Sequence, residues 1–181
     1  DAEDRRTELE TRRVVHMGSY HLGGLQLTVV PENWSGTVTV RTALDGTVTN
    51  SGVARYRDLA GDHLRPVETE CFAPDSIALR VTTSQSRIDV AEAARTRLHQ
   101  RGHLLRPDRR TLEEPGYIAQ EMDVELERGE ALSVEKLVAV YTSRDHAIAE
   151  AGVEARGTVA HYPDYRRLAD SQAEAGARFT G

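Results

Sequence analysis

The chain has 181 residues, of which 39% are hydrophobic and 5% aromatic, and it carries a formal net charge of −6. The length and apolar content fit one domain with a single core, and the acidic balance argues against a nucleic-acid partner, because phosphate binding needs a basic face. Cys71 is the only cysteine and no segment approaches the roughly 20 apolar residues of a membrane helix, so we expect a protein of the reducing cytoplasm without a membrane partner.

The first part of the chain shows the alternation of apolar and polar residues that is typical of antiparallel strands with one buried face. Residues 25–29 and 37–40 alternate in this way, on either side of a turn rich in Pro, Asn and Gly at 31–36. Asp45-Gly46 is a strong hairpin signal, and a second break follows at 50–52. Breaks at intervals of about eight to twelve residues predict a β-sandwich.

The middle of the chain predicts three further strands, at 64–72, 77–82 and 88–90. The third is expected to continue through 91–95, where alanine favours helix but the alternation favours strand. Residues 101–115 are polar, basic and rich in proline, and they predict an exposed loop.

The clearest hairpin is predicted between residues 118 and 141. Apolar residues alternate over 118–126, Arg128-Gly129 supplies a turn, and a second strand returns over 132–140. The returning strand is apolar on both faces near its end, which predicts an inner strand of the sheet.

After residue 142 the pattern changes to helix. Ser143 or Asp145 is expected to cap a first helix, and Pro163-Asp164 to open a second one. We therefore expect a β-sandwich domain over 1–142 and a helical linker over 143–181.

No catalytic or metal-binding constellation is predicted. Glycoside cleavage needs two carboxyl groups on opposite sides of the scissile bond, and the candidate carboxylates are better interpreted as parts of solvated faces. They are Glu68, Glu70, Glu113, Glu114, Asp123 and Glu125. His99 and His103 have a metal-like spacing but lie in a poorly defined segment, and His16 and His21, which could face a sugar, are interpreted as structural.

Three residues are candidates for sugar binding, which usually combines an aromatic ring with hydrogen-bond donors. Trp34 lies in a turn, and Arg55-Tyr56 lies at the end of a loop. The competing interpretations are a packed loop anchor for Trp34 and a guanidinium stacked on its neighbouring ring for Arg55.

Five stretches, taken together, carry a family resemblance. They are residues 12–17, 31–36, 44–50, 52–56 and 136–145. Their order and spacing resemble the N-terminal domain of glycoside hydrolase family 65, which includes maltose, trehalose and kojibiose phosphorylases and related hydrolases. The resemblance covers nearly the whole chain. It implies a mainly β, antiparallel super-sandwich of the galactose-mutarotase type, followed by a helical linker and an (α/α)6 catalytic barrel.

The same resemblance implies that the catalytic glutamate and the phosphate or water site lie in the barrel, beyond Gly181, so no residue here is carried over as catalytic. It also implies earlier strands before Asp1, so we expect a sandwich truncated at its N-terminus. In the linker the family shows a histidine followed by tryptophans, where this chain has Gln172 and Gly176.

We therefore expect the non-catalytic N-terminal domain of a bacterial family 65 hydrolase or phosphorylase that acts on α-glucosyl disaccharides in carbohydrate metabolism. The expected partners are its own catalytic domain, a second copy of the chain joined through strand edges, and an α-glucoside; no cofactor is expected. Two alternatives remain open. One is a stand-alone carbohydrate-binding module, and the other is a sugar epimerase of the related mutarotase fold, with His63 and Glu68 or Glu70 in one cleft.

Overall fold

A computed structural model describes residues 4–48, 63–146 and 150–179. These ranges contain ten strands and two C-terminal helices. The strands are β1 (Thr7–Val15), β2 (Leu22–Pro31), β3 (Gly36–Asp45), β4 (Leu64–Ala73), β5 (Ser76–Thr83), β6 (Asp89–Gln100), β7 (His103–Leu105), β8 (Arg110–Glu114), β9 (Tyr117–Leu126) and β10 (Leu132–Thr142). The helices are α1 (Ala151–His161) and α2 (Tyr165–Phe179).

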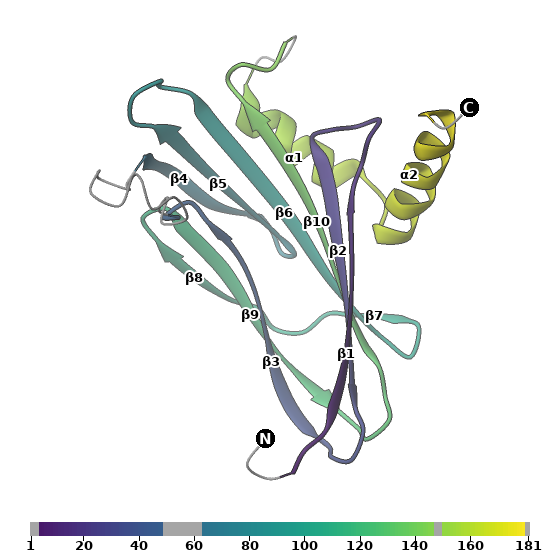
Figure 1. Ribbon diagram of the computed structural model, residues 1–181. Coiled ribbons are helices and arrows are strands. Elements are labelled where there is room, and N and C mark those ends of the chain that lie inside the picture. The colour runs from purple at the N-terminus through teal and green to yellow at the C-terminus, as the bar shows by residue number, and fades with distance from the viewer. Residues whose placement is uncertain (1–3, 49–62, 147–149, 180–181) are drawn as a thin grey trace, which may run out of the picture.

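The strands form two facing antiparallel sheets, as the sequence predicts. The larger sheet has the order β1-β2-β10-β6-β5-β4, with β7 paired to β6, and the smaller sheet has the order β3-β9-β8. Figure 1 shows the two sheets converging at one end and splaying apart at the other, with both helices packed on the larger sheet. The predicted mainly β sandwich with a helical C-terminus is confirmed.

The core between the sheets follows from the alternation in the strands. On β3 the even-numbered residues from Val38 to Leu44 point inward, and on β9 those from Ile118 to Leu126 do the same. They pack against the inner face of the larger sheet, which includes Leu98 and Leu132. Burying such a side chain contributes roughly 1.5–3 kcal/mol, so this shared core is the main source of cohesion between the sheets.

The predicted hairpin between residues 118 and 141 is wrong. Strand β9 pairs with β3 and β8 in the smaller sheet, whereas β10 pairs with β2 and β6 in the larger one. The turn at Arg128-Gly129 therefore carries the chain from one sheet to the other, and its Gly129 N–H donates to Pro31 O at 2.7 Å. Strands β9 and β10 each bury an apolar face in the shared core without pairing to each other. The prediction that the returning strand is an inner one is confirmed, because β10 lies between β2 and β6.

The predicted loop at 101–115 is also wrong in part, because it contains β7 and β8. Strand β8 is an edge strand whose side chains are all exposed, so its polar composition conceals it. The strand reading of 91–95 is confirmed, since these residues belong to β6. Within the described residues, Asp45-Gly46 does not join two paired strands: β3 pairs with β9, and β4 lies in the other sheet. Thr47 N–H donates to Asp45 Oδ1 at 2.8 Å. The second break at 50–52 lies outside the described residues.

The two helices differ from expectation in one respect. Helix α2 begins as predicted, and the Asp164 carboxylate accepts a hydrogen bond from Arg167 N at 2.8 Å. Helix α1 begins only at Ala151, so neither Ser143 nor Asp145 caps it. The Asp145 carboxylate instead accepts from Thr142 N at 2.6 Å and closes the turn after β10.

Both helices bury small or apolar faces on the outer side of the larger sheet. Under α1 lies a layer of alanines on β5, β6 and β10, which permits a close approach between helix and sheet. On α2, Tyr165 and Leu168 pack over Leu22 of β2 and Leu137 of β10. Neither helix, over its described residues, has the length and apolar character that crossing a bilayer requires.

Candidate functional site

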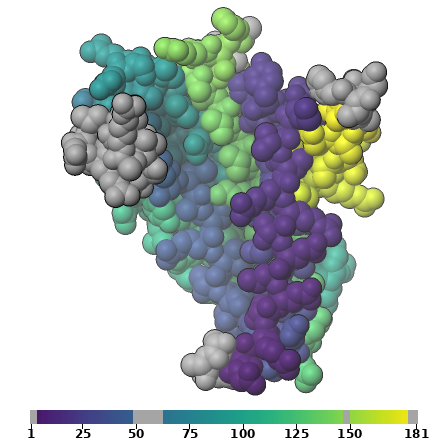
Figure 2. Space-filling model, viewed as in Figure 1, coloured from purple at the N-terminus to yellow at the C-terminus, as the bar shows by residue number. Residues whose placement is uncertain are grey.

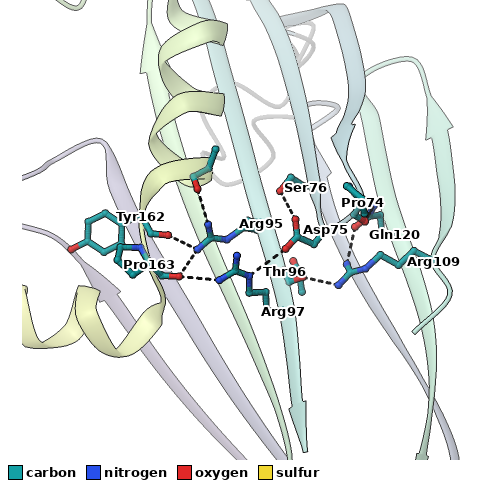
Figure 3. Close-up of polar contacts among 11 residues, drawn as sticks. Pro74, Asp75, Ser76, Arg95, Thr96, Arg97, Arg109, Gln120, Tyr162 and Pro163 are labelled. Carbon is teal, nitrogen blue, oxygen red and sulfur yellow. Dashed lines mark hydrogen bonds and ion pairs between the residues drawn. The ribbon is translucent and has the colours of Figure 1, made fainter. Parts of the chain in front are cut away.

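The junction between the two helices is held by a buried arginine on the sheet beneath it. Arg95 lies on β6 and is only 5% exposed. Its guanidinium donates to three backbone carbonyl oxygens, those of Ala160 at 3.1 Å, Tyr162 at 2.5 Å and Pro163 at 2.8 Å (Figure 3). Burial lowers the pKa of Arg95, and the neighbouring charge of Arg97 acts in the same direction. The carbonyl groups at the end of α1 offset this cost, because a helix C-terminus favours a cation.

A second arginine extends this contact toward the β4–β5 turn. Arg97 donates from Nη1 to Pro163 O at 3.1 Å and from Nε to Asp75 Oδ2 at 3.3 Å. Asp75 Oδ1 accepts from Ser76 Oγ at 3.0 Å, so the carboxylate is held in place. The helix junction is therefore tied to both β6 and the turn that begins β5.

Helix α2 has its own contacts with the β1–β2 turn. His16 is 9% exposed, and its Nδ1 accepts hydrogen bonds from Gly18 N and Ser19 N. The proton therefore resides on Nε2, which donates to Ser171 Oγ at 3.0 Å. Gln172 Oε1 accepts from Met17 N at 2.5 Å. His16 is thus a satisfied structural histidine, as the sequence interpretation has it, and Gln172 docks the helix.

A different polar group lies on the other side of β6, next to a cavity. Arg109 donates from Nη2 to Thr96 O at 2.8 Å and from Nη1 to Gln120 Oε1 at 3.0 Å. Gln120 is 1% exposed, and its amide also donates to Pro74 O at 3.0 Å. Figure 3 shows the two groups side by side, with Asp75 between the Arg95 and Arg109 sides.

Two further charged side chains lie at the splayed end, on the inner face of the larger sheet. Lys136 donates from Nζ to Ala43 O at 2.6 Å and so links the two sheets. Burial lowers the pKa of Lys136, while the charge of Glu92 raises it. Burial likewise raises the pKa of Glu92, and Lys136 opposes that shift. Glu92 therefore pays a desolvation cost when it ionises.

The carboxylates considered for glycoside cleavage are engaged in other contacts. Glu68 pairs with Arg80 at 3.2 Å and Glu70 with Arg156 at 3.0 Å, on the outer face of the larger sheet. On the smaller sheet, Asp123 pairs with Arg110 at 2.8 Å. Glu68 and Glu70 line one small pocket on the outer face of the larger sheet together with Arg80 and Arg156. Their pairings with these arginines engage both glutamates that the epimerase alternative needs. Within the described ranges, no group of three or more His, Cys, Asp or Glu could hold a metal ion.

The sugar-binding candidates are only partly described. The Trp34 ring packs against the inter-sheet core, its Nε1 donates to Thr7 Oγ1 at 3.0 Å, and the Arg5 guanidinium lies 5.7 Å from its ring centroid. This is the arrangement of a packed loop anchor, and a sugar-binding role stays a prediction. Arg55 and Tyr56 lie outside the described residues.

The sequence interpretation missed the residues that form the helix contact and the cavity. Ala91 and Ala93 lie on the outer face of β6, and Arg95 and Arg97 are the next two residues on that face. Arginines therefore occupy positions where the pattern predicts apolar side chains. This break in the pattern is the one local signal. Their partners are backbone carbonyl groups at 160–163, which no pattern of side chains identifies.

Comparison with known proteins gives a consistent family. Residues 1–179 match the family described as glycosyl hydrolase family 65, N-terminal domain. The chain is 36% identical over 178 residues to an uncharacterized glycosyl hydrolase of Mycobacterium tuberculosis (strain H37Rv), covering 98% of this chain. It is 31% identical over 140 residues to the kojibiose phosphorylase of Halothermothrix orenii, covering 77% of this chain.

The fold has a solved counterpart. A structure from the human microbiome, provisionally titled a kojibiose phosphorylase, superimposes with a TM-score of 0.74 at 11% sequence identity, over 94% of this chain and 21% of that one. The chain spans 13% of the length of the mycobacterial relative and 17% of the Halothermothrix orenii enzyme. The similarity therefore concerns one portion of much longer proteins.

Proposed function

This chain belongs to the glycosyl hydrolase family 65 N-terminal domain family, and from that premise we propose that it serves as the non-catalytic N-terminal domain of a longer enzyme acting on α-glucosyl disaccharides. Its role in that enzyme is to hold α1 and α2 in one orientation relative to the sandwich. The observation that carries the proposal is the buried Arg95, whose three hydrogen bonds fix the junction between the helices.

The disposition of the acidic side chains supports a non-catalytic role. The carboxylates on β4 and β9 that could act on a glycosidic bond are bound by arginines at the protein surface. A glycosidase acid instead needs an apolar surround that keeps it protonated, and a second carboxylate across the bond.

The substrate class is drawn from the relatives. Kojibiose phosphorylases are among them, which favours an α-linked glucosyl disaccharide and phosphorolysis in the longer enzyme. A cytoplasmic location is part of the same proposal, and the single cysteine, which allows no disulfide within the chain, supports it.

The test is an assay of the chain alone. It is incubated with kojibiose, maltose and trehalose, with and without phosphate, and release of glucose and glucose 1-phosphate is measured. We expect no release above buffer and no saturable heat in a calorimetric titration with millimolar sugar. Product release proportional to chain concentration would refute the proposal. Saturable sugar binding without turnover would favour the carbohydrate-binding module, and Trp34→Ala would then be the next variant.

A further inference from the structure

A cavity of about 610 Å³ lies beside Arg109, between the β4–β5 turn and the segment that joins β7 to β8. Leu104, Leu105 and Pro107 line its apolar side. Asp75 and Arg109 are among the polar lining residues, and none of the described residues of the lining is aromatic. A pyranose ring usually stacks on an aromatic face, so this cavity fits another class of ligand better.

Among the lining residues, Arg109 is the one whose surroundings indicate a ligand. It is half-buried, and burial lowers its pKa. Both of its hydrogen bonds go to neutral oxygens, those of Thr96 and Gln120. Over the ranges 4–48, 63–146 and 150–179, no carboxylate oxygen lies within 4.0 Å of this guanidinium, unlike those of Arg97 or Arg110. The charge of Asp75 acts against this desolvation without contacting the guanidinium, and an anion in the cavity would offset the cost that remains.

The geometry around Arg109 is fixed before any ligand binds. Gln120 is 1% exposed, and its amide is held between Arg109 and Pro74 O. Thr96 is equally buried, and its hydroxyl bonds Thr42 on the facing strand β3 at 3.0 Å. Of the five N–H groups of the guanidinium, these neighbours use two, one on each terminal nitrogen, which leaves three that can donate to the oxygens of a carboxylate or phosphate.

The charges around the cavity favour an anion although the whole chain carries −6. Three arginines line it, namely Arg97, Arg106 and Arg109, against two acids, Asp75 and Asp108. Asp75 is paired with Arg97, and Arg106 and Asp108 are both exposed to solvent, which leaves Arg109 as the remaining half-buried charge of the lining.

We propose that this cavity is a binding site for a small oxyanion, a carboxylate or a phosphate group, that pairs with the Arg109 guanidinium. The site shares Arg97 and Asp75 with the contacts that tie down the helix junction, but its anion-binding group, Arg109, makes no hydrogen bond with Arg95 or with the described residues of the helices.

The experiment uses the 181-residue chain and three probes at constant ionic strength: inorganic phosphate, malonate and glucose. Binding is measured by calorimetric titration and by the rise in the midpoint of thermal unfolding. We expect phosphate, malonate or both to bind saturably, and the pair of results distinguishes a phosphate site from a carboxylate site. Arg109→Gln is expected to weaken binding by at least about tenfold, because it removes a charge-assisted hydrogen bond.

Two further variants keep the test decisive. Arg110→Gln is the matched control, since it removes the same charge from the next residue, which is exposed and faces Asp123; we expect it to change affinity by less than about twofold. Asp108→Asn removes an exposed negative charge from the lining and should tighten binding a fewfold, even if Arg109→Gln fails to fold. The proposal is overturned if neither anion binds, if glucose binds instead, or if the two arginine variants weaken binding equally.

Discussion

A guanidinium buried without a carboxylate has few stable environments, and the carbonyl groups at the end of a helix provide one of them. Arg95 occupies such a place, bonded to Ala160, Tyr162 and Pro163. The residue therefore contributes to both the stability of the fold and the position of the helices.

Arg95→Met is expected to lower the free energy of unfolding by about 2–4 kcal/mol, because it leaves buried carbonyl groups unsatisfied. The control is Arg110→Met, which removes an ion pair from a side chain that is 57% exposed and should lower the free energy of unfolding much less than Arg95→Met. Urea unfolding of both variants measures the difference, and equal losses would mean that Arg95 acts only as a surface charge.

Glu92 makes the free energy of unfolding depend on pH, and the direction of its pKa shift sets the sign of that dependence. Burial raises its pKa in the folded chain above the value in the unfolded chain, so its contribution to stability is fully present at acid pH and is lost as the pH rises through the raised pKa. Glu92→Gln should match the wild type in stability near pH 4 and exceed it at pH 8. Glu8→Gln, an exposed change of equal charge on β1, serves as the control. If the wild type instead became more stable than the Glu92→Gln variant as the pH rises, the raised pKa of Glu92 would be contradicted.

At the scale of elements, the docking of α2 depends on the absence of a side chain at Gly24. A Cβ built there would lie 2.6 Å from Leu168 Cδ2, and Leu168 is fully buried. Gly24→Ala should therefore destabilise the protein by about 1–3 kcal/mol through overpacking. The control is Gly157→Ala in α1, where the same methyl meets nothing within 4 Å and should stabilise by up to about 1 kcal/mol. Opposite signs in thermal unfolding are the expected result, and a stable Gly24→Ala variant would mean that α2 can shift on the sheet.

The strands show what a sequence can predict and where it stops. Period-two alternation locates strands and their buried faces, so β2, β3, β5, β9 and β10 are recognised. Alternation does not indicate which strands pair. For this reason the sequence predicts a hairpin at Arg128-Gly129, although this turn joins the two sheets. The exposed strand β8 has no buried face to reveal it.

The candidate site was predictable to a smaller degree. Its key contacts join side chains on β6 to the backbone of a segment more than 60 residues further on. Its cavity arises where β4, β6 and β9 come together in space. Neither feature leaves a signal in the local sequence. The structural role of His16, in contrast, could be predicted, because most histidines outside a catalytic or metal-binding pattern are structural.

At the scale of the whole molecule, the edge strands β1 and β3 of the described sheets offer unpaired backbone groups along their outer edges. Figure 2 shows β1 running along the surface beside α2, and Leu9 and Val15 on this edge strand are 64% and 74% exposed. Strand β3 is a ten-residue edge without proline or lysine, and such edges favour pairing with another chain.

We predict that the isolated chain associates at high concentration, as measured by analytical ultracentrifugation. The double variant Leu9→Lys and Val15→Lys should reduce association, since lysine protects a strand edge, and it should leave the fold intact because both side chains are exposed. A wild-type monomer at every concentration would contradict this prediction.

The most direct test of the central claim, that the sandwich holds its C-terminal helices in one orientation, is a distance measured by electron spin resonance. Spin labels are placed at Glu8→Cys on β1 and Glu174→Cys on α2, in a chain with Cys71→Ser. We predict a single narrow distance distribution that broadens when Arg95→Met is added. A broad distribution in the chain with Arg95 intact would show that the helices move freely, and it would contradict the proposed role.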